Sequence, residues 1–493
     1  LNEVLKPVYQ QIAYNRGVEL YNNFEYEQAV KHFSKAMKYP VDPVTNALAK
    51  YWTAEAFYQR AEKKGDAGLY ETALENYSIY EIEAGAPRTP MYASVQYNIG
   101  YAHYQLKNYP AAIVALRKFV LDKSAPAERI CDACMRIGDC YYVSRDFSAA
   151  ADFYEQAFNV KTTRNPEKDY ALYQRGMSLG LEKKYEDKIA SLATLLTQYP
   201  KSGYIAAARF ETAHTYQLID KPEEAIRYYN MLIGENNGSP YIRRCYSQMG
   251  LIYENQNDYD HALLCYKRVV DLDKHSEESN NVLPQIKHIY AEVKKDPAGY
   301  ENYLKSIGEK PSNSQMDSIT YKIGKDYYTA GDCGNAAPAL GKYLSSFPSG
   351  LFSYEALYMK AECDLQNTKP EEALAGYRAV LNQPAGKYTE PALRRAAAIC
   401  YNKQDYAPAY EYYSRLETVP AYVFDARMGM MRSAWALQQY ENAAAAANKV
   451  LGSDNLAQDK ALEAHLVIAR AAIHAQNFNL AYNEYGLVKA GTK

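Results

Sequence analysis

Two short strings in this 493-residue sequence have the residue types and spacing of known catalytic or metal-binding motifs. Residues 176–180 read Gly-Met-Ser-Leu-Gly, the nucleophile-elbow pattern, in which Ser178 would act from a strained strand-to-helix turn. Cys131 and Cys134 have the spacing of a redox pair or of half a zinc site. Each assignment depends on the element that carries the string.

The rest of the sequence contains no catalytic pattern. No Gly-rich loop ends in Gly-Lys-Ser/Thr, as a phosphate-binding loop requires. No two of the eight His lie three or four residues apart, as a zinc-binding helix requires. We therefore expect no catalytic residue, cofactor or metal, and we predict that the chain is not an enzyme.

Tyrosine is the residue whose abundance points to binding. The chain has 51 Tyr against 12 Phe and 2 Trp. A tyrosine ring offers a large contact area at low entropic cost, and its hydroxyl adds a hydrogen bond. A tyrosine-rich surface suits an extended polypeptide, and it could also stack against sugar rings.

Charge and hydropathy exclude other classes of partner. The formal net charge is −2, and no long Lys/Arg run is present, so we expect neither nucleic acid nor an anionic membrane as a partner. No apolar stretch approaches the roughly 20 residues that span a bilayer. The eight Cys are too few for a disulfide framework, and their spacing predicts no pairing.

A repeat of about 37 residues runs along the chain. Its marker is an aromatic residue, an Ala three positions later, and an aromatic residue or Leu four positions after that, as in Phe147, Ala150 and Tyr154. Twelve residues before the Ala stands a small residue such as Gly138. We number each unit so that Gly17 is at position 8, which puts the marker Ala at position 20 and the second aromatic at position 24. Twelve clear units and one degraded copy near Gly299 follow.

Each unit is predicted to be a helical hairpin. Small residues at positions 8 and 20 let two antiparallel helices approach closely, and the aromatic at position 24 is expected to pack against the next unit. In this frame Gly176 is at position 8 of a helix, which argues against a nucleophile elbow around Ser178. Cys131 and Cys134 fall on a first helix, where packing is expected, with a labile disulfide or a metal as the alternative.

The pattern of Gly or Ala at position 8, Ala at position 20, an aromatic at position 24 and a closing Pro resembles the tetratricopeptide repeat (TPR). The resemblance implies an all-α fold, a right-handed α-solenoid (superhelix) of about 12–13 TPR-like hairpins. Residues 199–210 also resemble TPR modules of the bacterial cell envelope, and the whole chain resembles large multi-TPR envelope proteins. The Lys and Asn residues with which some TPRs clamp a terminal carboxylate are absent.

First helices of such an array line its concave wall, and positions 5, 9 and 12 face that groove. In the first four units the predicted partner-binding residues are Tyr14, Tyr21, Tyr51, Tyr58, Tyr97, Tyr101, Tyr104 and Tyr142. A second, more basic patch is predicted at Tyr401, Arg432, Trp435 and Arg470. The alternative is that many of these rings pack against a neighbouring hairpin.

The predicted organisation is three segments. TPR units one to seven occupy residues 1–279, a degenerate TPR-like unit that could bend the array occupies 280–316, and units eight to twelve occupy 317–493. The extra residues 63–69 are expected to form a loop, and Pro338 is expected to delay a second helix. Both ends, at Leu1 and Lys493, are expected to be cut, with the array continuing beyond them.

The predicted function is a non-enzymatic scaffold for protein–protein interactions that binds a partner protein or peptide along the Tyr-lined groove. Its expected location is the bacterial periplasm or cell envelope, with the cytoplasm as the alternative. Two other functions remain open: a glycan- or nutrient-associated binding module, and a regulatory arm of an enzyme whose catalytic domain lies outside this chain.

Overall fold

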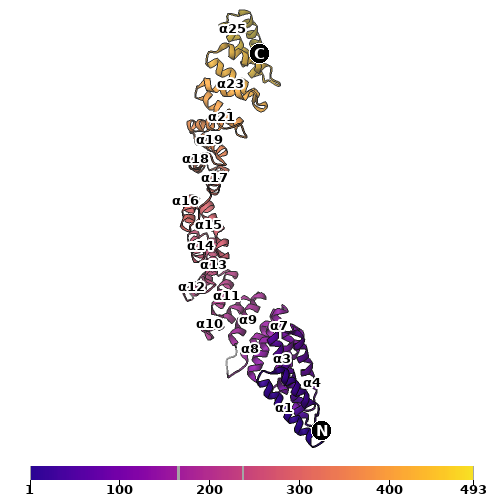
Figure 1. Ribbon diagram of the computed structural model, residues 1–493. Coiled ribbons are helices and arrows are strands. Elements are labelled where there is room, and N and C mark those ends of the chain that lie inside the picture. Colours follow the sequence, from indigo (N-terminus) through magenta and orange to yellow (C-terminus); the bar gives the residue numbers. More distant parts are fainter. Residues whose placement is uncertain (1, 164–166, 236–237, 492–493) are drawn as a thin grey trace. The chain divides into compact units, whose positions relative to one another are not determined.

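The computed structural model describes residues 2–163, 167–235 and 238–491. Within these ranges the chain forms 26 α-helices and no strand, which confirms the all-α prediction (Figure 1). The helices fall into two compact units, Leu1–Leu272 and Asp273–Lys493. The predicted cut ends, at residues 1 and 492–493, lie outside the described ranges.

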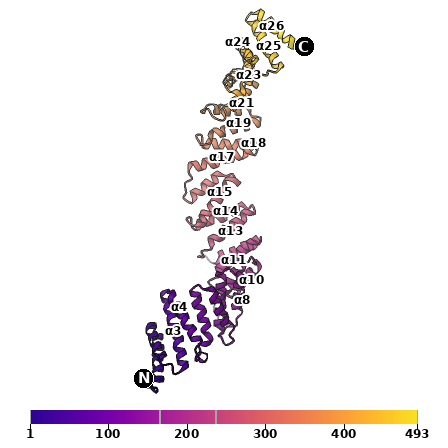
Figure 2. The same ribbon diagram turned by 90° about the vertical axis from the view of Figure 1, so that its right-hand side faces the viewer.

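The first unit, unit 1, consists of seven helical hairpins (Figure 2). Two short 3₁₀ turns, Ala86–Arg88 and Tyr92–Ser94, connect α4 to α5. Its helices are α1 (Leu5–Asn22), α2 (Tyr26–Met37), α3 (Pro43–Lys64), α4 (Ala67–Glu81), α5 (Val95–Gln105), α6 (Tyr109–Val120), α7 (Ala127–Val143), α8 (Phe147–Asn159), α9 (Lys168–Leu181), α10 (Tyr185–Gln198), α11 (Ile205–Leu218), α12 (Pro222–Glu235), α13 (Ile242–Asn255) and α14 (Tyr259–Leu272).

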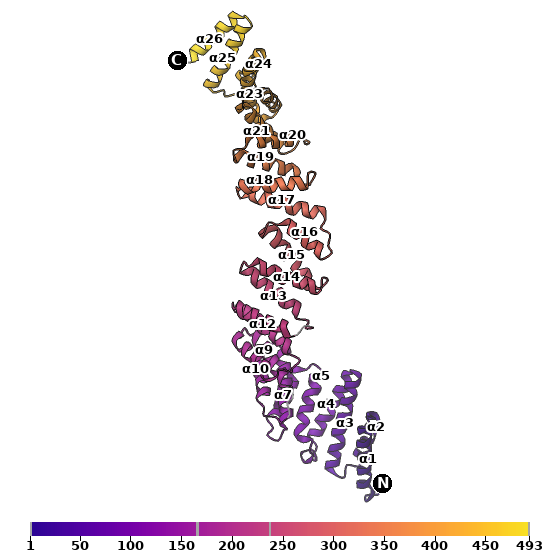
Figure 3. The ribbon, with the colours of Figure 1, turned by 90° about the vertical axis from the view of Figure 1, so that its left-hand side faces the viewer.

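The second unit, unit 2, begins with the degraded copy and continues with five regular hairpins (Figure 3). In the degraded copy α15 runs into a π-helical turn, Ile289–Val293, before α16. The helices are α15 (Glu277–His288), α16 (Pro297–Ser306), α17 (Asn313–Thr329), α18 (Cys333–Ser346), α19 (Ser353–Gln366), α20 (Pro370–Leu381), α21 (Thr389–Asn402), α22 (Tyr406–Leu416), α23 (Val423–Ala436), α24 (Tyr440–Leu451), α25 (Gln458–His474) and α26 (Phe478–Gly491).

The side chain at position 24 packs inside its own hairpin and also against the next unit, as predicted; Tyr77, for example, shares a cluster with Val95 and Ile99 of α5. A Cβ added at Gly250, position 8 of α13, would lie 2.3 Å from Cε1 of Tyr266 on α14. The same pair recurs between Gly138 and Tyr154, where the separation would be 2.7 Å. Glycine at position 8 therefore makes room for the ring at position 24.

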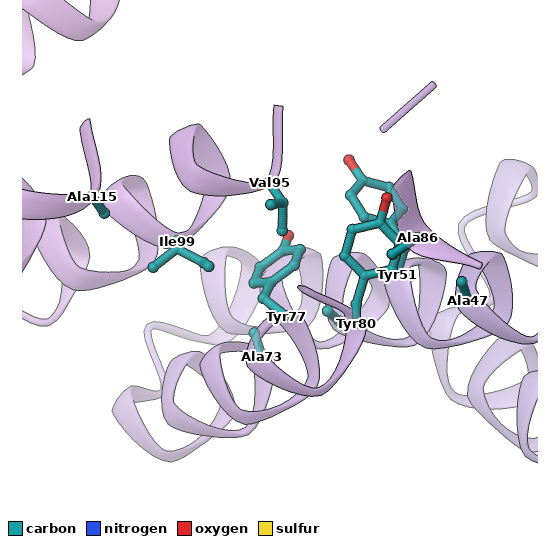
Figure 4. Close-up of a cluster of buried hydrophobic side chains, with 10 residues drawn as sticks. Ala47, Tyr51, Ala73, Tyr77, Tyr80, Ala86, Val95, Ile99 and Ala115 are labelled. Carbon is teal, nitrogen blue, oxygen red and sulfur yellow. The ribbon is translucent and has the colours of Figure 1, made fainter. Parts of the chain in front are cut away.

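Core clusters of this kind hold adjacent hairpins together. In unit 1, Tyr51 of α3 lies against Tyr77 and Tyr80 of α4, with ring centroids 6.0 and 5.4 Å apart (Figure 4). Val95 and Ile99 of the next first helix complete the cluster. All five side chains are buried, so much of the tyrosine excess serves the core.

The turn inside most hairpins contains a left-handed residue at position 15. In every hairpin except α3–α4 and α15–α16, that residue has a positive φ. These residues are Phe24, Lys107, Arg145, Lys183, Asp220, Asn257, Gly331, Thr368, Gln404, Gln438 and Gln476. Only one of them is Gly, the residue that adopts this conformation without strain.

Two local predictions about helix bounds were wrong. Residues 63–69 do not form a loop, because α3 extends through Lys64 and α4 begins at Ala67, with Gly65 in the left-handed region between them. Pro338 does not delay its helix, because α18 begins at Cys333 and contains the proline in its second turn. The proline removes one N–H donor there, and the packing of α18 tolerates the loss.

Candidate functional site

The first helices carry the predicted groove residues, and these residues divide by position. At position 12 each predicted aromatic packs on the aromatic at position 17 of its own hairpin, with ring centroids 5.2–6.1 Å apart. These pairs are Tyr21–Tyr26, Tyr58–Tyr70, Tyr104–Tyr109, Tyr142–Phe147, Tyr401–Tyr406 and Trp435–Tyr440. One face of each ring is therefore structural, and all six position-12 side chains remain half-buried.

At position 5 the rings are more deeply engaged. Tyr14 lies 6.1 Å from Phe33, and Tyr97 lies 5.2 Å from Phe119, both centroid to centroid. Tyr51 is only 7% exposed and belongs to the core cluster, so it presents almost no surface to a partner. For Tyr51 the packing alternative describes the structure better than the groove assignment.

Carboxylates on the first helices bind several of the tyrosine hydroxyls. Tyr97 and Tyr101 of α5 both donate to Asp132 of α7, the first at 2.7 Å. Two helical turns further along α7, Asp139 accepts from Tyr154 at 2.7 Å and forms an ion pair with Arg136 at 2.5 Å. The hydroxyls of Tyr97 and Tyr101 are therefore used in hydrogen bonds within the wall and are not available to donate to a partner.

The acid at position 9 is a recurring feature that sequence reasoning did not identify. Glu55 accepts from Tyr77 at 2.7 Å, and Glu362 accepts from Tyr377 at 2.5 Å. As with Asp139 and Tyr154, the donor is the tyrosine at position 24 of the same hairpin. The signal was present in the sequence as a Glu or Asp directly after the small residue at position 8.

Burial raises the pKa of two of these acids, Glu55 and Asp139. Desolvation raises the pKa of Glu55, although hydrogen bonds from Tyr77 and Tyr51 act in the opposite direction. Desolvation also raises the pKa of Asp139, against the opposing charge of Arg136. These carboxylates stiffen the wall, and each also accepts a hydrogen bond from the following hairpin, Glu55 from Asn98 and Asp139 from Tyr170.

Two of the four residues predicted for the basic patch in unit 2 line a cavity, and the other two do not. Tyr401 and Arg432 line a cavity of about 390 Å³ on α21–α23 and the start of α25. Trp435 is not part of its lining and packs against Tyr440 and His474 instead. Arg470 is exposed and lies outside the lining as well.

The strings with catalytic spacing lie in ordinary helices. Ser178 is buried in α9 and donates its hydroxyl to the carbonyl of Gln174 at 2.8 Å, as helical serines do. Cys131 and Cys134 are buried and form no disulfide, and desolvation raises the pKa of the Cys134 thiol to about 12. Neither string has the geometry of a nucleophile or of a reactive thiol pair.

Cys333 and Cys363 form a disulfide that the sequence analysis did not predict. Their Cα atoms are 4.8 Å apart, and the bond joins α18 to α19 across 30 residues of sequence. Among the described residues no group of three or more His, Cys, Asp or Glu is placed to hold a metal ion. Within the same ranges, no helix has both the length and the apolar character needed to cross a membrane.

Family models described as tetratricopeptide repeat match four segments of the chain, residues 66–128, 170–202, 243–276 and 321–388. A comparison with curated proteins finds no match.

Solved structures with similar folds include three bacterial proteins. The C-terminal part of a TPR repeat-containing protein from Cytophaga hutchinsonii is 18% identical, covers 54% of this chain and 98% of its own, and has a TM-score of 0.43. The pilF protein of Pseudomonas aeruginosa is 19% identical, with coverages of 51% and 98% and a TM-score of 0.32. A tetratricopeptide repeat protein from Parabacteroides merdae is 13% identical, with coverages of 62% and 98% and a TM-score of 0.27.

The matched segments lie in both units and coincide with hairpins that have a small residue at position 8 and Ala or Lys at position 20. By these matches and this hairpin geometry, the chain contains tetratricopeptide repeats in both of its units.

Proposed function

We propose that the chain is a non-enzymatic scaffold that holds a partner polypeptide along the wall formed by its first helices. Tetratricopeptide repeats indicate a scaffold for protein–protein interaction, and the wall is where this chain concentrates aromatic side chains with one face packed and the other accessible. Half-buried rings such as Tyr104 and Tyr142 give contact area without a large loss of rotamer entropy on binding.

The observation that carries the proposal is the rigidity of this wall. Asp132 binds two tyrosines of α5, and Glu55 and Asp139 each link a hairpin to the next through hydrogen bonds. A surface held in place before binding loses less entropy when a partner docks. Such a wall suits recognition of an extended polypeptide better than adaptable contact with many shapes.

A crosslinking experiment tests the location of binding. Peptides that bind the full chain are first selected from a random library. They are then bound to two variants of the chain, one with a photo-crosslinking residue in place of Tyr104 on α5 and one with it in place of Val114 on α6. Val114 is 58% exposed on the second helix of the same hairpin and serves as the matched control. Crosslinks at position 104 without crosslinks at 114 support the proposal, whereas the reverse pattern, or a library without binders, overturns it.

We also propose that the protein acts in the bacterial cell envelope. The Cys333–Cys363 bond supports this location, because structural disulfides form and persist in oxidising compartments. The resemblance of residues 199–210 to envelope TPR modules points the same way.

The test of location is fractionation of cells that make the native protein, with thiols quenched by acid and then alkylated in denaturant, because both cysteines are buried in the folded chain. A periplasmic protein with Cys333 and Cys363 protected from alkylation is expected. A cytoplasmic protein in which both thiols react would contradict the proposal.

A further inference from the structure

The cavity in unit 2 has an unusual lining. Four cationic side chains, Arg394, Arg395, Arg432 and Lys460, face a space of about 390 Å³, against one carboxylate, that of Asp425. They come from the first helices of three successive hairpins, α21, α23 and α25. The cavity therefore lies on the same kind of wall that the proposed function assigns to the partner.

Two of the arginines are held in place by acids outside the lining. Arg432 donates from Nε and Nη2 to both carboxylate oxygens of Glu463, at 2.6 and 2.7 Å. Arg395 binds Glu362 in the same two-pronged way, with both distances 3.0 Å. Each pair occupies one edge of the guanidinium and leaves its remaining N–H groups available to a further acceptor.

Arg394 is the cation of the lining that no described acid binds, and Asp425 is the one carboxylate that shares the cavity with it. It is exposed, its guanidinium lies 5.6 Å from the centroid of the Tyr422 ring, and it forms no ion pair among the described residues. Lys460 is paired with its neighbour Asp459 at 3.0 Å. The pocket thus holds two oriented guanidinium groups and a third, that of Arg394, which is not bound to an acid.

The other walls are aromatic. Tyr401 and Tyr413 lie beside the arginines in the lining. Gly429 lets the Tyr413 ring pack directly on the backbone of α23, since a Cβ there would lie 2.5 Å from that ring. An anionic group on a short apolar stem fits this combination, because the stem contacts rings while the charge meets guanidinium N–H groups.

We propose that this pocket binds a carboxylate of the partner polypeptide, with the rest of the peptide running along the wall. The inference rests on the proposed function and specifies the chemistry of its ligand. An acidic side chain and a peptide C-terminus carry the same carboxylate, and the test separates these sources.

The probe is a fluorescein-labelled peptide that alternates glutamate and leucine, with an amidated C-terminus, titrated against the full chain. Its counterparts are the same peptide with glutamine for glutamate, and the glutamine peptide with a free C-terminus. Tighter binding of the glutamate peptide indicates a side-chain carboxylate. Tighter binding of the free-terminus peptide than of its amidated form indicates a terminal one, and either result supports the proposal.

Variants of Arg394 test whether the carboxylate binds in this pocket. Arg394→Ala is expected to weaken binding of the preferred peptide about three- to tenfold, and Arg394→Glu by more, with the loss shrinking at high salt. Arg415→Ala and Arg415→Glu are the matched controls, because Arg415 is exposed on α22 and outside the lining. Circular dichroism of each variant checks that the fold is kept.

The outcomes separate this inference from the scaffold proposal. Equal affinity for all three peptides, or equal losses from Arg394 and Arg415 variants, overturns the carboxylate pocket while leaving a peptide-binding scaffold intact. No binding by any of the three peptides also overturns it. The scaffold proposal is decided separately, by the random library and the crosslinking pattern at positions 104 and 114.

Discussion

At the scale of single residues, the contact that defines this array joins a small residue at position 8 to a large one at position 24. Gly17 faces Phe33, and Gly324 faces Leu340, with added Cβ atoms 2.5 and 2.6 Å from the partner side chain. The ring or branched chain at position 24 is completely buried in both hairpins. The cost of any side chain at position 8 is thus a steric overlap with a core group that has no room to move.

Gly250→Ala is expected to destabilise the protein by about 1–3 kcal/mol, because the new methyl group would lie 2.3 Å from Tyr266. The matched control is Gly234→Ala on α12, where an added Cβ meets nothing within 4 Å. That exchange is expected to stabilise by about 0.5–1 kcal/mol, since Ala is the better helix former. Urea unfolding followed by circular dichroism measures both, and equal effects would contradict the packing argument.

The buried acid at position 9 predicts a pH effect. The pKa of Glu55 is raised above its usual value of 4.5 by burial, so the folded state binds this proton more tightly than the unfolded state does. Stability contributed by Glu55 therefore rises as the pH falls through the raised pKa, and it is lower at neutral pH.

Comparison with Glu55→Gln isolates this contribution. The free energy of unfolding of wild type minus that of the variant is expected to increase from pH 7 towards pH 4.5, since the variant lacks the titrating group. Glu75→Gln, on the exposed side of α4, is the matched control for exchanging a carboxylate for an amide in the same hairpin. A flat difference for Glu55→Gln would mean that its pKa is not raised.

At the scale of elements, the hairpins were predictable and their details were not. The spacing of markers such as Ala112 and Ala150 predicted where each hairpin lies, because close helix approach demands small residues at fixed positions. The left-handed turn residue escaped prediction, since only Gly331 has the residue type that marks this conformation. The disulfide escaped too, because Cys333 and Cys363 belong to different hairpins and no spacing rule connects them.

The candidate site was predictable to a similar degree. The period placed Tyr401 and Arg432 on one wall, where the structure brings them into one pocket. Arg394 was not predicted, although it occupies position 5 of α21, because an aromatic side chain was the signal that marked groove residues at that position. Tyr51 was predicted to face the groove, but it is buried in the core. A residue at position 5 faces the wall or the core depending on the size of the residues around it.

The turn residue yields a prediction at this scale. Thr368 has a φ of 61° in the turn between α19 and α20, a conformation that is strained for a β-branched residue. Thr368→Gly is expected to stabilise the protein by about 1 kcal/mol because it relieves this strain. Gly331→Ala, at the same position of the preceding hairpin with a φ of 74°, is expected to destabilise by a similar amount.

The Gly331 exchange is free of packing effects, since nothing lies within 4 Å of an added Cβ there. Thermal unfolding of both variants measures the pair. Effects of the same sign would show that backbone strain does not govern this turn.

At the scale of the molecule, each unit is built from contacts between helices that follow one another in sequence. In unit 1 the buried clusters join neighbouring hairpins, as Phe210 and Cys245 join two of them. In unit 2 Tyr377 and Cys400 do the same. Stability in such an array is approximately a sum over hairpins and their interfaces, so unfolding of the whole chain need not be a single transition.

The division at Leu272 predicts that each unit folds by itself. Fragments 1–272 and 273–493 are both expected to show the helical circular dichroism of the parent and a cooperative urea transition of their own. A control cut between Asn257 and Asp258 separates α13 from α14, so Tyr266 loses the pocket at Gly250. Fragment 258–493 should then expose an unpaired α14 and unfold or aggregate more readily than 273–493. If instead 273–493 is unfolded while the control fragments are stable, the two compact units are not the cooperative units of the chain.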